Sequence, residues 1–158
     1  KMFGNGRARS GIIVLPCGAG KTLTGVTAAS TIKRSTIVLC INTMSVKQWK
    51  EQFQMWTTVP DKLICMFTSD FKEMLPPPSQ ACIVLTTYTM ITASGQRSEE
   101  ANIMLKALAE REWGVMILDE VHVTPANKFR KVLSVINAHC KLGLTATLVR
   151  ERERERER

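Results

Sequence analysis

Short apolar runs alternate with amphipathic stretches along the chain. The apolar runs are rich in β-branched residues, as in strands buried on both faces, and cover residues 11–16, 35–42, 62–67, 81–88, 113–120 and 141–147. The stretches with helical periodicity cover residues 20–33, 45–56, 98–112 and 124–139. This alternation predicts an α/β fold, with a mainly parallel sheet covered by helices on both faces, in one domain over residues 1–150.

Three predicted features give local detail. Ser45 with Gln48 forms a capping-box pattern, so we expect a helix to begin there. Its apolar face, expected to pack in the core rather than to contact nucleic acid, is Val46, Trp49, Phe53 and either Met55 or Trp56. Thr124 before Pro125 predicts the start of the last helix. The apolar stripe of that helix is Phe129, Val132, Leu133 and Ile136. Three prolines at 76–78 predict a loop, because proline continues neither helix nor sheet.

Charge and cysteine content narrow the function classes. The formal net charge is +8, and basic residues cluster at Arg7/Arg9, Lys33/Arg34 and Lys128/Arg130/Lys131. This excess suits a polyanionic partner such as nucleic acid, and a solvated basic surface is the alternative.

The 5 cysteines show no CxxC spacing, so we expect neither a zinc site nor a disulfide framework. We expect Cys40, Cys65 and Cys82 in the core. Without a run of 18 apolar residues, neither a membrane span nor secretion is expected.

The end of the chain is a strict Glu-Arg repeat over residues 151–158. Such a repeat buries no apolar surface, so we interpret it as an artificial or unstructured tail outside the domain.

The segment LPCGAGKTL, residues 15–23, lies between an apolar run and a predicted helix. Its two glycines permit a tight turn whose N–H groups point at phosphate oxygens at the amino end of a helix. Lys21 would reach the β- and γ-phosphates, and Thr22 would supply a hydroxyl to Mg²⁺. Leu15 stands where the strict phosphate-loop pattern has its first glycine, so an ordinary Gly-rich turn is the alternative.

Two further polar clusters follow apolar runs. Asp119 is placed to hold Mg²⁺ and Glu120 to orient and deprotonate a water, while residues 145–147 (TAT) follow another predicted strand. Carboxyl ends of parallel strands share one edge of the sheet. We therefore expect the glycine-rich turn, the acid pair and the TAT segment to meet there.

These segments resemble the motifs of a known family. GAGKT, DEVH and TAT match, in order, motifs of the DExH-type superfamily 2 helicases. SVKQWKEQF, WGVMILDEVH and AHCKLGLTATLVRE extend the similarity. The sequence is similar to the XPB-like DNA translocases of transcription factor TFIIH over nearly all of residues 1–151. It departs from them at Arg152, where the family has aspartate.

The resemblance implies a three-layer RecA-like P-loop NTPase domain, lobe one of two, with ATP and Mg²⁺ as cofactors. Catalysis would fall to Lys21, Asp119 and Glu120. Nucleotide binding would involve Pro16, Cys17, Gly18, Ala19, Gly20, Lys21 and Thr22. Thr22 and Asp119 would hold Mg²⁺. Coupling between nucleotide and DNA would involve His122, Thr145, Ala146, Thr147, Arg150 and Glu151. Contacts to DNA phosphates would involve Thr43, Ser45, Gln48, Thr86, Thr87 and Tyr88, although Thr86 and Thr87 also read as plain polar strand ends.

The resemblance also implies a function. It would be that of an ATP-binding lobe in a nuclear translocase that opens duplex DNA in transcription initiation and nucleotide excision repair. Its partners would be duplex DNA, other TFIIH subunits and the second RecA-like lobe of the same protein, with no membrane. Because that lobe supplies the arginine fingers, we expect this chain alone to bind nucleotide weakly and to hydrolyse it slowly or not at all. A small P-loop kinase and a catalytically silent docking module are the alternatives.

Overall fold

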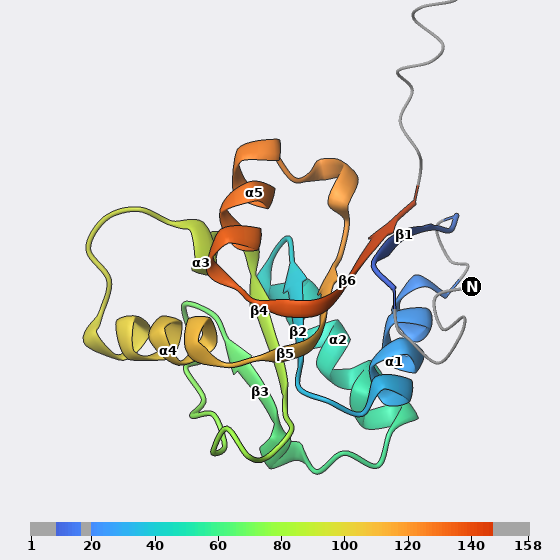
Figure 1. Ribbon diagram of the computed structural model, residues 1–158, viewed down its shortest axis with the longest axis horizontal. Coiled ribbons are helices and arrows are strands. Elements are labelled where there is room, and N and C mark those ends of the chain that lie inside the picture. Colours follow the sequence, from blue (N-terminus) through green and yellow to red (C-terminus); the bar gives the residue numbers. More distant parts are fainter. Residues whose placement is uncertain (1–8, 17–19, 147–158) are drawn as a thin grey trace, which may run out of the picture.

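Strands that are apolar on both faces form one parallel sheet in the computed structural model, which describes residues 9–16 and 20–146 (Figure 1). Across the sheet the order is β1 (Gly11–Val14), β6 (Ala138–Thr145), β5 (Trp113–Leu118), β2 (Thr36–Cys40), β4 (Ile83–Thr87) and β3 (Ile64–Phe67). Every neighbouring pair is parallel. The carboxyl ends of the strands therefore share one edge, as predicted.

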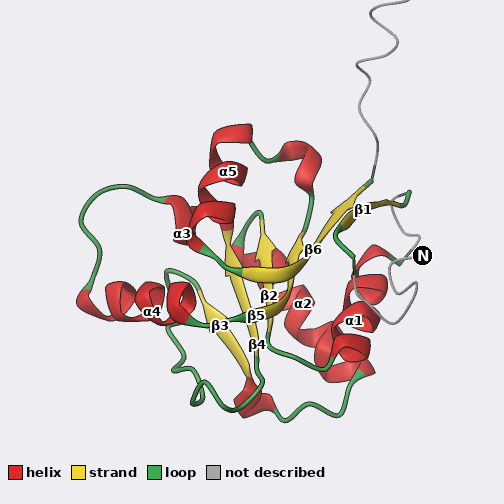
Figure 2. Cartoon of the chain, viewed as in Figure 1, coloured by secondary structure: helices red, strands yellow, loops and turns green. Residues whose placement is uncertain are grey.

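Helices cover both faces of this sheet (Figure 2). One face carries α1 (Lys21–Ile32) and α2 (Thr43–Trp56). The other carries α3 (Tyr88–Thr92), α4 (Glu99–Glu110) and α5 (Ala126–Val135). Adjacent strand residues alternate between the two cores: Val38 packs with α1 and α2, and Leu39 with the opposite layer. In the described part of the chain, no helix has the length and apolar character to span a bilayer. The predicted fold class is confirmed.

Several predicted element ends are wrong by a few residues. The cap of α2 is Asn42, whose Oδ1 accepts a hydrogen bond from the Ser45 N–H at 2.8 Å, so the helix begins at Thr43 rather than Ser45. The predicted cap at Thr124 is also wrong, because α5 has Pro125 at its N-cap and no side-chain cap. One-turn 3₁₀ helices, η2 (Asp61–Leu63) and η3 (Val121–Val123), were not predicted.

The apolar faces of the helices agree largely with the prediction. Trp49 and Phe53 are buried, but Met55 is 65% and Trp56 56% exposed, so the predicted core position of either one is wrong. The helix ends at Trp56, and the Trp56 indole N–H donates to Gln52 Oε1 at 3.0 Å. The stripe predicted on α5 does pack against the sheet: Phe129, Val132, Leu133 and Ile136. The predicted core cysteines, Cys40, Cys65 and Cys82, are buried.

A buried arginine attaches the loop that holds the three prolines. Arg111 directly follows α4 and is 6% exposed. Its guanidinium donates to the Pro76 carbonyl at 2.6 Å and to Cys82 Sγ at 2.7 Å. It also lies over the Trp113 ring, 5.8 Å from the centroid. The loop prediction at residues 76–78 is confirmed, and this side chain joins the loop to the sheet.

Candidate nucleotide site

The amino end of α1 lies at the carboxyl edge of the sheet, next to the end of β6. Gly20 is its N-cap, with φ 84° and ψ 33°, a left-handed conformation that glycine adopts without strain. No side chain caps the helix, and its first turn carries no acid. The N–H groups of Lys21, Thr22 and Leu23 precede the first intrahelical bond, from Thr24 N to Gly20 O at 2.9 Å. An uncapped helix amino end with a lysine favours an anion.

An ion pair joins this helix end to the acids after β5. Lys21 Nζ lies 2.5 Å from Glu120 Oε1, and the two side chains are 12% and 26% exposed. Glu120 has φ 50° and ψ 45°, an uncommon left-handed conformation for a residue with a side chain. This turn ends β5 sharply and leads into η3. Lys21, directly after the glycine-rich turn, thus lies against the acid pair, while residues 17–19 of the turn lie outside the described part of the chain.

Asp119 is held by four hydrogen bonds. Oδ1 accepts from the Glu120 N–H at 3.0 Å, and Oδ2 accepts from Trp49 Nε1 at 3.0 Å. The backbone N–H of Asp119 donates to Leu39 O at 2.9 Å, and its carbonyl accepts from the Tyr88 hydroxyl at 2.7 Å. Burial raises the pKa of the Asp119 carboxyl, and the bond from Trp49 opposes that rise. The contact with Trp49 was not predicted, because a tryptophan on the apolar face of a helix is first a core residue.

His122 connects the acid pair to the end of β6. Its Nδ1 lies 2.7 Å from Thr145 Oγ1 and 3.3 Å from Glu120 Oε2. Thr145 is the last residue of β6, where its carbonyl also accepts from Leu15 N at 3.0 Å. A chain of contacts thus runs from Lys21 through Glu120 and His122 to Thr145, across three strand ends.

The other predicted nucleotide and coupling residues lie at the margins of this arrangement. Pro16 is an exposed residue after β1, and Ala146 directly follows β6. The remaining predicted residues lie outside the part of the chain that the structure describes: Cys17, Gly18, Ala19, Thr147, Arg150 and Glu151. The Glu-Arg repeat lies outside it as well.

The residues predicted to contact DNA divide into two groups. Thr43, Ser45 and Gln48 lie in the first turns of α2 and are partly or fully exposed. The second group is buried: Thr86 is 0%, Thr87 6% and Tyr88 4% exposed. Thr87 Oγ1 caps α3, Tyr88 binds the Asp119 carbonyl, and the Thr86 hydroxyl has no hydrogen-bond partner in the described chain. These three side chains are therefore buried or already hydrogen-bonded in this structure, and their contact with DNA phosphates stays a prediction.

The donor set fits a magnesium ion that is shared with phosphates. In residues 9–16 and 20–146, no group of three or more His, Cys, Asp or Glu side chains is placed to hold a metal ion. Mg²⁺ commonly takes one or two protein ligands and completes its shell with water and substrate phosphates. The Asp119 carboxylate and the Thr22 hydroxyl, next to an uncapped helix end, are ligands of that kind.

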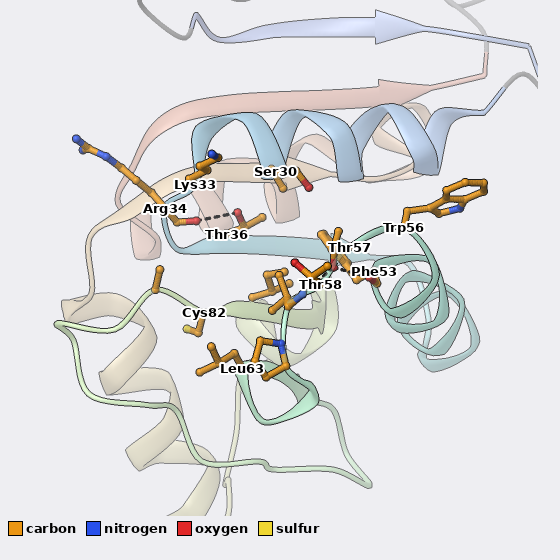
Figure 3. Close-up of a pocket in the computed structure, with 15 residues that line it drawn as sticks. Ser30, Lys33, Arg34, Thr36, Phe53, Trp56, Thr57, Thr58, Leu63 and Cys82 are labelled. Atoms are coloured by element: carbon orange, nitrogen blue, oxygen red, sulfur yellow. Dashed lines mark hydrogen bonds between the residues drawn. The ribbon is translucent and has the colours of Figure 1, made fainter.

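A hollow of about 540 Å³ opens at the opposite edge of the sheet (Figure 3). It lies between the last turns of α1 and α2 and the segment that enters β4, and it includes Lys33, Phe53 and Trp56. About 18 Å of helix separates Lys33 from Lys21, at 1.5 Å per residue. This hollow is therefore separate from the candidate nucleotide site.

Comparison with known proteins identifies the family to which the chain belongs. Residues 3–150 match the family described as "Type III restriction enzyme, res subunit". The chain is 60% identical over 151 residues to the XPB2 subunit of general transcription and DNA repair factor IIH from Arabidopsis thaliana. It is 58% identical over 151 residues to the XPB subunit from Drosophila melanogaster. Each match covers 96% of this chain but only 20% and 18% of the relative.

Solved structures share the fold at low sequence identity. The UvsW helicase of bacteriophage T4 superposes with a TM-score of 0.70 at 18% identity, covering 93% of this chain and 50% of that one. The helicase domain of Pyrococcus furiosus Hef superposes with a TM-score of 0.65 at 22% identity, covering 94% and 32%. These likenesses support the RecA-like fold. The chain belongs to the family of the type III restriction enzyme res subunit, and nearly all of it is similar to about a fifth of the XPB helicase/translocase subunits of factor IIH.

Proposed function

We propose that this chain is the ATP-binding lobe of an XPB-like, DNA-dependent translocase. The observation that carries the proposal is the contact between Lys21 and Glu120, which joins a helix amino end to an acid 99 residues later. An uncapped helix end, a lysine and two acids at one sheet edge form a set suited to a nucleoside triphosphate with its metal. The similarity to XPB subunits supports the same assignment.

Each side chain has a proposed role. Lys21 and the first-turn N–H groups of α1 bind phosphate oxygens, and the preceding residues of the phosphate loop complete the nucleotide contacts. Asp119 and Thr22 hold Mg²⁺, which when bound neutralises the charge that develops on the phosphates. Glu120 orients a water and takes its proton. Because Glu120 pairs with Lys21, phosphate binding and the freeing of Glu120 for this task are linked.

The route from nucleotide to DNA is proposed to pass through His122. Its Nδ1 contacts both Glu120 and Thr145, so a shift of Glu120 reaches the end of β6. The exposed first turns of α2, with Thr43, Ser45 and Gln48, are the proposed contact with DNA backbone phosphates, which carry no sequence information. In the whole protein this lobe would work with a second RecA-like lobe and other TFIIH subunits in the nucleus, at promoters and at sites of excision repair.

ATP hydrolysis with and without duplex DNA tests the proposal. A protein that contains both lobes is compared with this chain alone and with a two-lobe Glu120→Gln variant. We expect DNA-stimulated hydrolysis by the two-lobe protein, a loss of at least a hundredfold in the variant, and negligible turnover by the single lobe. Rapid, DNA-independent turnover by this chain alone would overturn the proposal and favour the P-loop kinase.

A further inference from the structure

The indole of Trp49 connects the middle of α2 to the acid that follows β5. Its Nε1–H donates to Asp119 Oδ2 at 3.0 Å, and the two residues are 1% and 9% exposed. The residues are 70 positions apart in the sequence. The tryptophan side chain has one hydrogen-bond donor, its indole N–H. In a buried tryptophan that serves only to fill the core, any nearby backbone carbonyl could accept that hydrogen bond. Here the donor is used on a carboxylate of the candidate site.

The indole has little freedom to move. A Cβ built on Gly25 of α1 would lie 2.6 Å from Trp49 Cη2, so glycine allows the ring to sit directly against that helix. Phe53, one turn later in α2, has its ring centroid 6.1 Å from that of Trp49. The ring is therefore a fixed part of the core, and the direction of its N–H is set by packing.

The two bonds to the carboxylate fix its orientation. Oδ2 accepts from Trp49 and Oδ1 from the Glu120 N–H, one bond for each oxygen. A carboxylate oxygen has two lone pairs, so each oxygen retains one for a further ligand. Both bonds also favour the charged carboxylate, against the cost of its burial.

We propose that Trp49 is a positioning residue that orients Asp119 for divalent metal and so ties the metal site to α2. This inference rests on the proposed function, in which Asp119 and Thr22 hold Mg²⁺. Residues that hydrogen-bond a metal ligand commonly contribute 10- to 100-fold to metal affinity. Trp49 thus acts through Asp119 and does not touch nucleotide or metal.

Trp49→Phe tests the proposal, because phenylalanine keeps an aromatic ring but has no donor. Trp113→Phe is the matched control. Trp113 is also buried, 0% exposed, and its indole donates to Leu108 O at 2.9 Å. It begins β5, whereas Asp119 follows the other end of that strand. Binding of Mn²⁺ in the presence of ADP is measured by electron paramagnetic resonance, and ADP binding without metal by calorimetry. We expect about a tenfold loss of Mn²⁺ affinity in Trp49→Phe, with metal-free ADP binding within about twofold of the wild type. Trp113→Phe should leave both unchanged.

The outcomes separate the two proposals. Equal losses in both variants, or no loss in Trp49→Phe, would overturn the role of Trp49 while the metal site stands. ADP binding by the wild type that does not respond to Mn²⁺ would reject the proposed metal site itself, and the role of Trp49 with it.

A second readout does not depend on how Trp49→Phe folds. The chain has 3 tryptophans, so a Trp56→Phe/Trp113→Phe chain emits only from Trp49. Paramagnetic Mn²⁺ at Asp119 should quench this emission when ADP is present. Bound Mn²⁺ without quenching would place the metal away from Asp119 and contradict the proposal.

Discussion

Replacing Arg111 with methionine should loosen the proline loop and destabilise the domain. The guanidinium donates to the Pro76 carbonyl at 2.6 Å, to the Gln80 carbonyl at 3.4 Å and to Cys82 Sγ at 2.7 Å. Within the described chain, no carboxylate lies within salt-bridge distance of it. Methionine keeps an unbranched apolar stem but donates no hydrogen bond.

The expected loss follows from these contacts. Two carbonyls lose a charged donor, at about 1 kcal/mol each, and the contact with the Trp113 ring contributes about 1 kcal/mol. Relief from burying the Arg111 charge offsets part of this, which leaves about 2 kcal/mol. For a domain of this size that free energy corresponds to a fall in melting temperature of about 4–8 °C.

Thermal unfolding followed by circular dichroism measures this fall, and limited proteolysis reports on the loop. Cleavage between residues 68 and 82 should be faster in Arg111→Met, because the loop loses its attachment to the sheet. Arg97→Met is the control, since Arg97 is bonded to carbonyls near the surface; it should change stability by less than about 0.5 kcal/mol. Wild-type stability and a wild-type cleavage rate in Arg111→Met would show that Arg111 does not hold the loop to the sheet.

Three further predictions test the site and the core. Glu120→Gln removes the carboxylate that pairs with Lys21. Nucleotide should therefore bind about fivefold more tightly, a gain of ~1 kcal/mol in binding free energy. Calorimetry that finds equal or weaker binding would contradict this. Gly25→Ala places a methyl group 2.6 Å from Trp49 Cη2 and should lower the free energy of unfolding by ~1–2 kcal/mol. The melting temperature should therefore fall; a rise would mean that the higher helix propensity of alanine outweighs the clash. Burial raises the pKa of the Cys65 thiol from 9.0 to about 11. Its contribution to stability is therefore complete below pH 9 and lost as pH rises through 11. The urea midpoint should fall between pH 8 and pH 10.5, and by less in Cys65→Ala; the same fall in both would exclude Cys65 as the cause.

The sequence was sufficient for the parallel sheet and the edge where the site lies. The strands β2, β3, β4 and β5 are mainly apolar and buried on both faces, and their carboxyl ends can be placed without knowing the neighbours. That rule predicted the glycine-rich turn and the acid pair at one edge of the sheet, and the contact of Lys21 with Glu120 agrees with it. Element ends were less predictable, because capping depends on local backbone geometry: Asn42 and Ser45 are both good caps, and only the structure shows which one bonds.

Contacts between distant core residues could not be predicted. The apolar period places Trp49 on the buried face of its helix, but not the direction of its N–H, which depends on the packing of Gly25 against the ring. Trp56 lies at the same helical spacing as Trp49 and Phe53, yet the helix ends at Trp56 and its side chain lies at the surface. Likewise Thr86 lies near the carboxyl end of β4 and Tyr88 is the first residue of α3, at the expected edge, but the sequence pattern alone did not show that both are buried.

The most direct test of the account is calorimetry of Mg-ATP binding to this chain and to Lys21→Ala. Lys21 lies at the amino end of α1 and pairs with Glu120, so its loss removes both the proposed phosphate contact and that pair. We expect measurable binding by the wild type that Lys21→Ala abolishes, with negligible hydrolysis by either. Binding that is unchanged in Lys21→Ala would contradict the assigned site, and no binding by the wild type would favour a docking module that keeps only the shape of a nucleotide site.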